Sequence, residues 1–234
     1  MSWLHASMKQ DWNAMAQKNA YYYVVTHDEF ADPERCDQEQ FFDSGKQCVD
    51  DILTKWDVPH DPSWSVLEIG SGLGRLTRNL ATHYGHVVGL DVSPEMIRRA
   101  RELTPWLDFR EVHGTDLRDF ADNSVDMVFS WLVLQHLPRQ RLILNYIAAM
   151  ARVLKPGGLA VFQVPTSFHS RFKRIYWDLI RPRSSDPLRE KVSFRGSTLT
   201  VGTVQRHAVR YGLHPIIVRD EGSYYTGFKL QKDW

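Results

Sequence analysis

The sequence has few of the features that mark secreted or membrane proteins. Its 234 residues include only two cysteines, Cys36 and Cys48, which have no C-x-x-C or metal-ligand spacing and are expected to be reduced thiols. No apolar run approaches the roughly 18 residues of a membrane span, and residues 1–10 lack the apolar centre of a secretory signal. The formal net charge is only +1, which argues neither for nor against a nucleic-acid partner. The cytoplasm is the expected location.

A short apolar strand followed at once by three alternating glycines is the clearest local signal. Residues 66–69 predict a buried strand, and a helical period begins at Leu76. Between them lie Gly70, Gly72 and Gly74. A side chain at such a corner would keep the backbone away from a ligand, and tight turns often require φ > 0. The pattern therefore predicts a nucleotide-binding corner.

The spacing of these glycines helps to choose the nucleotide. A dinucleotide site has the pattern G-x-G-x-x-G, whereas Arg75 occupies the place of that third glycine here. An acid, Glu68, also stands two residues before the first glycine. The pattern E-x-G-x-G-x-G from Glu68 to Gly74 resembles motif I of the class I S-adenosylmethionine-dependent methyltransferases. In that family the loop lies against the aminoacyl part of the cofactor. An NAD-type domain or a merely tight turn is the alternative at this point.

Acidic residues end the next two predicted strands. Residues 86–90 predict a strand that leads to Asp91, whose carboxylate can accept two hydrogen bonds from ribose hydroxyls. This position does not separate NAD from S-adenosylmethionine, because both contain a ribose diol. Residues 107–113 predict a third strand, and Asp116 follows it at a ligand-binding end of the sheet. The resemblance implies that Asp116 accepts from the adenine amine; a solvated loop acid is the alternative.

A helix is predicted directly after Asp91, with Ser93 as its N-cap and Pro94 at its first position. The pattern D-x-S-x-x-M resembles a second signature of the family, in which the Met96 position packs near the adenine. Ordinary core packing is the alternative for Met96. The cofactor-binding residues implied by the resemblance are Glu68, Gly70, Ser71, Gly72, Asp91, Val92, Met96, Thr115, Asp116, Leu117 and Ser130.

Two further signatures follow in the second half of the chain. Residues 124–130 predict the fourth strand, and the pattern D-x-V-x-S-x-x-x-L-Q-H-L that runs through it resembles small-molecule methyltransferases. The L-K-P-G-G sequence of residues 154–158 resembles the family's turn into the fifth strand. The chain lacks the D/N-P-P-Y/F/W tetrapeptide of amino-methylating nucleic-acid enzymes and has no cysteine in this region. These absences count against DNA adenine and cytosine methylation.

The order of these signatures implies the fold. It is an α/β fold with a Rossmann-like seven-stranded methyltransferase sheet, mostly parallel with one antiparallel strand, and with helices on both faces. Residues 201–211 predict an amphipathic helix closed by Gly212. Residues 213–218 and 224–230 then predict a terminal strand pair, which is a family trait that a dinucleotide domain does not share.

Residues 1–62 are predicted to form an N-terminal helical extension ahead of a methyltransferase core at residues 63–234. Apolar spacing predicts one helix along the first 25 residues and a second from Asp37 to Lys55, before a Pro-containing breaker. The extension either caps the sheet edge or closes as a lid. Aromatic faces attract a sulfonium cation, which makes Trp12 and the three tyrosines Tyr21, Tyr22 and Tyr23 the candidate lid residues, with no choice among them.

A basic and aromatic insertion is expected at about residues 165–196. Between Phe168 and Arg195 there are eight basic and three acidic residues, and the apolar spacing predicts an amphipathic helix. This helix would be a lid over the acceptor pocket, a dock for an anionic substrate or carrier, or a membrane-surface segment. In the family, insertions at this place commonly help to form the acceptor pocket. The expected acceptor-binding residues are Trp12, Tyr22, Trp131, Phe168 and Tyr176.

The resemblance implies methyl transfer from S-adenosylmethionine to a hydroxyl or amine of a small molecule, with S-adenosylhomocysteine as product. A protonated acceptor needs a base, and His136 is the candidate because it follows the central strand and can titrate near neutrality. Its alternative is simple packing; His113 and His169 are weaker candidates. No acidic pair follows the fourth strand, so no metal is expected. An NAD oxidoreductase, a non-catalytic cofactor-binding protein and a methyltransferase of a macromolecule or lipid are the other hypotheses. The oligomeric state is not indicated.

Overall fold

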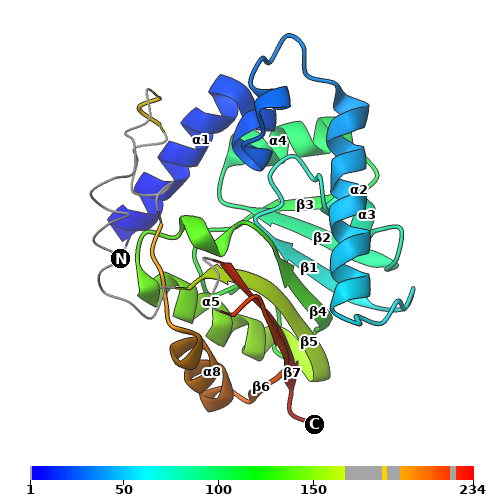
Figure 1. Cartoon of the computed structure of the whole chain (residues 1–234), viewed down its shortest axis with the longest axis vertical. Helices are drawn as coiled ribbons and strands as arrows, with labels where there is room; N and C mark the ends of the chain where they lie inside the picture. Colours follow the sequence, from blue (N-terminus) through cyan, green and yellow to red (C-terminus); the bar gives the residue numbers. More distant parts are fainter. Residues whose placement is uncertain (1, 167–185, 189–195, 222–224) are drawn as a thin grey trace. The chain divides into compact units, whose positions relative to one another are not determined.

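In a computed structural model of the chain, residues 2–166, 186–188, 196–221 and 225–234 are described (Figure 1). The chain divides into two compact units, Met1–Gly114 and Thr115–Trp234. The N-terminal extension of residues 1–62 therefore belongs to the same unit as the first strands. Each unit carries part of the predicted site. The glycine loop and Asp91 belong to the first unit, and Asp116 and His136 belong to the second.

The strands form a seven-stranded sheet in the order β3-β2-β1-β4-β5-β7-β6. β7 runs antiparallel to both β5 and β6, whereas β1, β2 and β3 pair in parallel, as do β4 and β5. The predicted seven-stranded sheet with one antiparallel strand is confirmed. The strands are β1 (Ser65–Ile69), β2 (His86–Asp91), β3 (Asp108–Glu111), β4 (Val125–Ser130), β5 (Leu154–Pro165), β6 (Leu213–Arg219) and β7 (Tyr225–Lys232).

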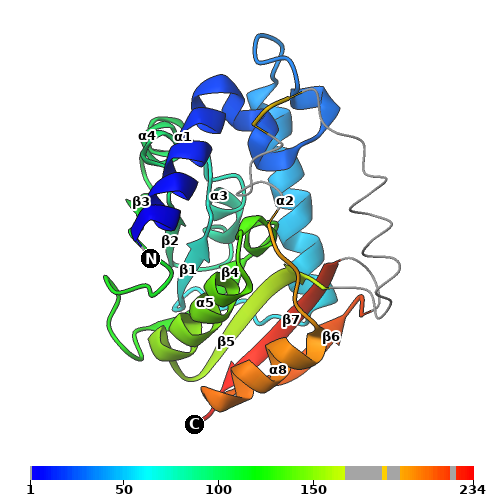
Figure 2. The same ribbon diagram turned by 90° about the vertical axis from the view of Figure 1, so that its left-hand side faces the viewer.

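The helices of the first unit surround β1 to β3. They are α1 (Ser2–Val25), the 3-10 turn η1 (Asp28–Phe30), α2 (Gln38–Lys55), α3 (Thr77–Leu80) and α4 (Pro94–Leu103). α1 packs beside α4, and α2 packs beside α3 (Figures 1 and 2). The second unit adds η2 (Leu134–His136), α5 (Gln140–Val153) and α8 (Val201–Arg210), of which α5 and α8 lie side by side (Figure 2).

Capping residues set the starts of α2 and α4, and the cap of α4 is the one that the sequence predicts. The Asp37 side chain accepts hydrogen bonds from the amides of Glu39 and Gln40 and so begins α2 at Gln38. Ser93 caps α4 in the same way by accepting from the Met96 amide. At α4 the cap is reinforced from α1, because Asn13 Oδ1 lies 3.1 Å from the Glu95 amide and accepts from it.

α1 contains a kink that the apolar spacing does not predict. Asn19 has non-helical angles (φ −163°, ψ 89°) inside the helix. Its buried side chain replaces the lost helical bonds: Nδ2 donates to the carbonyls of Phe30 (2.9 Å) and Ala31 (3.1 Å), and Oδ1 accepts from the Tyr22 amide (3.1 Å). The kink therefore turns the end of α1, residues 20–25, and fixes it to η1.

The L-K-P-G-G sequence was expected as a turn between a helix and a strand, and this expectation is wrong. These residues are the beginning of β5 itself, which starts at Leu154 directly after α5. The pairing with β4 shifts there, from Val125–Leu154 to Met127–Leu159. The additional residues form a bulge, for which Gly157 supplies a positive φ of 78°.

Candidate functional site

The glycine loop after β1 has the backbone conformation that its sequence predicts. Gly70, Gly72 and Gly74 all have positive φ, at 78°, 54° and 82°. The space beside two of them is filled by protein. A Cβ on Gly72 would lie 2.7 Å from Val24 Cγ2 of α1, and one on Gly74 would lie 2.6 Å from the Phe109 ring of β3. At Gly72 and Gly74 the backbone is therefore approached closely by side chains of the same unit. The glycine pattern had instead predicted close approach by a ligand.

Asp91 stands at the end of β2 and faces this loop. Its Oδ2 accepts from the Gly72 amide and its Oδ1 accepts from the Ser93 amide, both at 2.9 Å. The carboxylate thus links the glycine loop to the N-terminus of α4, with Val92, which is half-buried, between them. Burial raises the pKa of Asp91, and the backbone donors oppose this effect. The amide of Val92 is a further backbone donor to this carboxylate, which has about four lone-pair sites and is therefore largely satisfied by the protein.

Glu68 lies on β1, two residues before Gly70, and is buried, with 2% of its surface exposed. The Thr77 hydroxyl donates to Glu68 Oε2 at 2.5 Å. Burial raises the pKa of Glu68 to about 7, although the Thr77 hydrogen bond and the nearby Arg75 charge act in the opposite direction. Ser71 is also buried, and its Oγ has no hydrogen-bond partner among the described residues. The loop therefore presents one buried hydroxyl that a ligand is able to satisfy.

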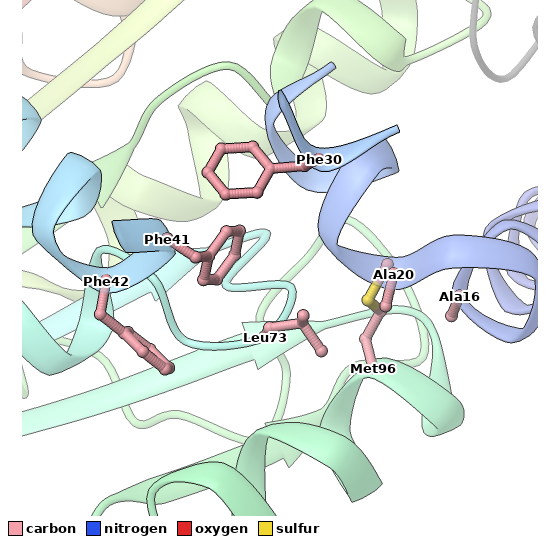
Figure 3. Close-up of a cluster of buried hydrophobic side chains, with 7 residues drawn as sticks. All are labelled: Ala16, Ala20, Phe30, Phe41, Phe42, Leu73 and Met96. Atoms are coloured by element: carbon pink, nitrogen blue, oxygen red, sulfur yellow. The ribbon is translucent and has the colours of Figure 1, made fainter. Parts of the chain in front are cut away.

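The N-terminal helices pack over this corner through a hydrophobic cluster (Figure 3). Leu73 of the glycine loop lies between phenylalanines of η1 and α2 on one side and alanines of α1 on the other. Met96 of α4 is a buried member of the same cluster, so its described contacts are those of core packing. The members are Ala16, Ala20, Phe30, Phe41, Phe42, Leu73 and Met96. Trp12 and Tyr22 are half-buried on α1, outside the cluster.

The second unit begins with the predicted adenine-side residues Thr115, Asp116 and Leu117. Arg152 of α5 fixes this loop by donating to the carbonyls of Asp116 (3.0 Å) and Leu117 (2.8 Å). Thr115 Oγ1 accepts from Asn145 at 3.4 Å. Leu117 has a positive φ of 51°, which is unusual for a leucine and marks a constrained backbone.

The Asp116 carboxylate is exposed and already forms an ion pair with Arg118, with Arg118 Nη2 2.6 Å from Asp116 Oδ2. The hydrogen bonds from Arg118 lower the pKa of Asp116. This geometry is that of the solvated loop acid, which was the alternative to adenine recognition. Asp116 therefore keeps its cofactor role only as a prediction.

His136 ends η2, which follows β4 by a short loop. Ser130 at the end of β4 is fully buried, and the half-buried Trp131 stacks on Phe129 with ring centroids 6.3 Å apart. Leu132 then has a positive φ of 62°, so the chain turns sharply before η2. The Nε2 of the half-buried His136 lies 3.1 Å from Gln135 Nε2. Where the Gln135 amide nitrogen donates, this His136 nitrogen is the acceptor.

Gln135 was not singled out by sequence reasoning, although it lies within the L-Q-H-L pattern. Its Oε1 is buried and has no hydrogen-bond partner among the described residues. A buried carbonyl oxygen without a partner is costly, and a donor group on a bound molecule removes that cost. Gln135 therefore joins His136 as a candidate acceptor-binding residue. The only sequence signal for it is its place beside the predicted base.

Both ends of the basic insertion are anchored in the second unit beside η2. Thr166 forms a parallel bridge with Leu199, whose amide donates to the Pro165 carbonyl. Gly196 packs so tightly against η2 that a Cβ there would lie 1.5 Å from the Gln135 carbonyl oxygen. Phe168, His169 and Tyr176 lie outside the described residues, so their predicted roles stay predictions. His113 is exposed and belongs to the first unit, where it pairs with Glu111 at 3.4 Å.

The described residues hold no group of three or more histidine, cysteine or acidic side chains placed to bind a metal. No helix among them is long and apolar enough to cross a bilayer.

The strand order, the glycine loop after β1 and the acid after β2 define a Rossmann-like fold of the methyltransferase type, and comparisons with known proteins agree. Residues 67–162 match the family described as a methyltransferase domain. The chain is 32% identical over 139 residues to the trans-aconitate 2-methyltransferase of Azoarcus sp. (strain BH72), covering 58% of this chain and 52% of that protein. It is 35% identical over 133 residues to the demethylmenaquinone methyltransferase of Tropheryma whipplei (strain Twist), covering 52% and 54%.

A solved structure matches over nearly the whole chain. Magnesium protoporphyrin IX methyltransferase from Synechocystis PCC 6803, with bound S-adenosylhomocysteine, has a TM-score of 0.66 at 14% identity and covers 97% of this chain and 99% of that chain. Residues 67–162 therefore match a methyltransferase domain in sequence, and the seven-stranded sheet has the fold of solved methyltransferases. The alignments span only about half the length of the two curated relatives.

Proposed function

We propose that this chain is a methyltransferase that uses S-adenosylmethionine to methylate a small molecule. The observation that carries the proposal is the position of Asp91, whose carboxylate is held at the end of β2 by the amides of Gly72 and Ser93. A carboxylate fixed in this way beside a glycine loop suits a ribose diol. The class of the domain favours S-adenosylmethionine over NAD as the source of that ribose.

The first unit fits the cofactor in two respects. Asp91 retains acceptor capacity for a ribose hydroxyl beside its backbone donors, and Ser71 offers a buried hydroxyl without a partner among the described residues. When bound, S-adenosylmethionine supplies a methyl group activated by a positive sulfonium centre. Glu68, Gly70, Ser71, Gly72, Asp91, Val92, Met96, Thr115, Asp116, Leu117 and Ser130 remain the proposed cofactor-binding residues. Within this set, Met96 now carries the smallest weight because its surroundings are those of a core residue.

A small-molecule acceptor is supported by the curated relatives, whose names state trans-aconitate and demethylmenaquinone as substrates. A hydroxyl, carboxylic acid or amine acceptor is the proposal for this chain. His136 would accept a proton from a hydroxyl or ammonium acceptor, and Gln135 Oε1 would accept a hydrogen bond that orients it. Trp131 is the proposed apolar wall because it follows β4 directly.

The proposed experiment measures cofactor binding and turnover separately. Calorimetric titration with S-adenosylmethionine, S-adenosylhomocysteine and NAD should show binding of the first two only, and Asp91→Ala should abolish it. Asp91→Asn, which keeps one acceptor oxygen, should bind at reduced affinity, and the thermal unfolding midpoints of both variants separate lost binding from a folding defect. Binding of NAD alone, or of none of the three, would refute the proposal.

Turnover is then tested with labelled S-adenosylmethionine and a panel of carboxylic acids, hydroquinones and amines. His136→Gln should lower the rate for hydroxyl and ammonium acceptors while cofactor affinity stays within about twofold, because a loss of turnover without a loss of binding indicates an interaction made only in the transition state. Binding without turnover on any acceptor would instead favour a non-catalytic cofactor-binding protein. A methyltransferase acting on a macromolecule or lipid depends on the insertion, which lies outside the described residues.

A further inference from the structure

A pair of histidines lies in the first unit outside the glycine loop and Asp91. His60 belongs to the segment between α2 and β1, and His83 belongs to the turn between α3 and β2. Their Nδ1 atoms are 3.2 Å apart, and the ring centroids are 4.6 Å apart at an interplanar angle of 73°. On the other side of its ring, His83 Nε2 lies 3.1 Å from Asp50 Oδ1 of α2. Nothing in the proposed methyl transfer uses these three residues.

We propose that His60 and His83 form a two-histidine site for a divalent transition-metal ion, with Asp50 orienting His83. Metal–imidazole bonds of about 2.0–2.1 Å at a tetrahedral angle place the two nitrogens roughly 3.3 Å apart. The observed Nδ1–Nδ1 separation of 3.2 Å matches that distance. Imidazole nitrogen is a preferred ligand of Zn²⁺, Cu²⁺ and Ni²⁺. The described residues hold no group of three side chains placed to bind a metal, so water molecules would occupy the other coordination positions of the ion.

The Asp50 contact is the second observation that supports a metal site. Metal-binding histidines usually donate their other ring N–H to a carboxylate, which fixes the tautomer and directs the free nitrogen at the metal. With its proton on Nε2, His83 donates to Asp50 and leaves Nδ1 available. Lys46, one turn before Asp50 on α2, pairs with the other carboxylate oxygen at 2.5 Å and holds the group in place.

The two segments that carry the histidines are already fixed to each other by independent contacts. Tyr84 donates from its hydroxyl to the Pro59 carbonyl at 3.0 Å, and its ring stacks on Trp64 with centroids 6.0 Å apart. Gly85 permits this close packing, because a Cβ there would lie 2.2 Å from the Pro62 carbonyl oxygen. The histidines are therefore presented by a rigid support, which reduces the entropy cost of binding an ion. A bound metal would add a further connection between the α2–β1 segment and the α3–β2 turn.

The test uses the full chain without a polyhistidine tag, titrated calorimetrically with ZnCl2 and CuCl2. We expect one ion per chain, and at least a tenfold loss of affinity in both His60→Gln and His83→Gln. Asp50→Asn should weaken binding by about tenfold, as expected of a positioning residue. His86→Gln is the matched control, because His86 is an exposed histidine at the start of β2 and has no place in the pair.

A spectroscopic measurement separates this site from unspecific binding by other histidines. The Cu²⁺ electron paramagnetic resonance spectrum should show coupling to two imidazole nitrogens in the wild-type chain and in His86→Gln, and to fewer in His60→Gln. Since His60 is exposed, this variant keeps its fold even if His83→Gln does not. Unchanged binding and spectrum in His60→Gln would overturn the proposal. So would the absence of binding at 0.1 mM metal, which would leave a histidine–histidine hydrogen bond alone.

Discussion

Replacement of the buried Glu68 by glutamine should change how the stability of the protein depends on pH. The pKa of Glu68 is raised to about 7 from 4.5, because burial disfavours its charged form. A carboxyl group with a raised pKa in the folded state contributes stability that is present below pH 4.5 and is lost as the pH rises through about 7. Between pH 5 and pH 8 this loss amounts to roughly 2–3 kcal/mol, from the linkage relation applied to these two pKa values.

Glu68→Gln removes the titrating group but keeps an oxygen that can accept from Thr77. The variant should therefore lose less stability than the wild type between pH 5 and pH 8, by roughly 2–3 kcal/mol. For a chain of this length that difference corresponds to roughly 5–10 °C in the unfolding midpoint. Thermal unfolding followed by circular dichroism at both pH values measures it. Glu34→Gln, at an exposed acid, is the matched control. Parallel pH profiles of the wild type and Glu68→Gln would refute the argument.

Three further predictions concern the packing around the site. Asn19→Ala removes the side chain that bonds two carbonyls and one amide at the kink of α1, and should lower the free energy of unfolding by about 1–3 kcal/mol in urea titrations; an unchanged midpoint would contradict the assigned role. Gly72→Ala places a methyl group 2.7 Å from Val24 at a positive φ, and should lower both stability and S-adenosylmethionine affinity, whereas an effect on neither would show that the loop is loosely held. Gly196→Ala should lower turnover while the cofactor dissociation constant stays within about twofold, because its Cβ would displace the Gln135 carbonyl next to His136; loss of cofactor binding would place Gly196 elsewhere in the mechanism.

The parts of the fold that depend on local chemistry could be predicted from the sequence. Asp37 and Ser93 cap their helices through their own neighbours, and Asp91 lies at the strand end that its apolar run indicates. The starts of α2 and α4 could be predicted for the same reason, because each depends on a residue next to it in the chain. Around Gly70 the positive φ was also predictable, because alternating glycines after a strand rarely have another use.

Features that depend on distant residues could not be predicted in this way. Nothing near Gly72 in the chain shows that Val24 fills the space beside it, and Asn19 gives no local sign of its bond to the Phe30 carbonyl. The Gly157 region was expected as a turn, since a bulge needs the register of the partner strand, which one strand alone does not contain. Met96 fits a cofactor signature by spacing and yet lies in the cluster of Figure 3, because helical spacing describes a core residue equally well.

The short distance between the two anchors of the insertion has an evolutionary consequence. Thr166 and Leu199 are bridged partners, so the chain leaves and re-enters the fold at one place. The entropy of closing a loop grows only slowly with its length, by about 0.6 kcal/mol for each doubling. The entropy of loop closure therefore places little penalty on a change in chain length between Thr166 and Leu199. Under the proposed role of the insertion in acceptor binding, acceptor preference can change through this one segment while the glycine loop and Asp91 stay the same.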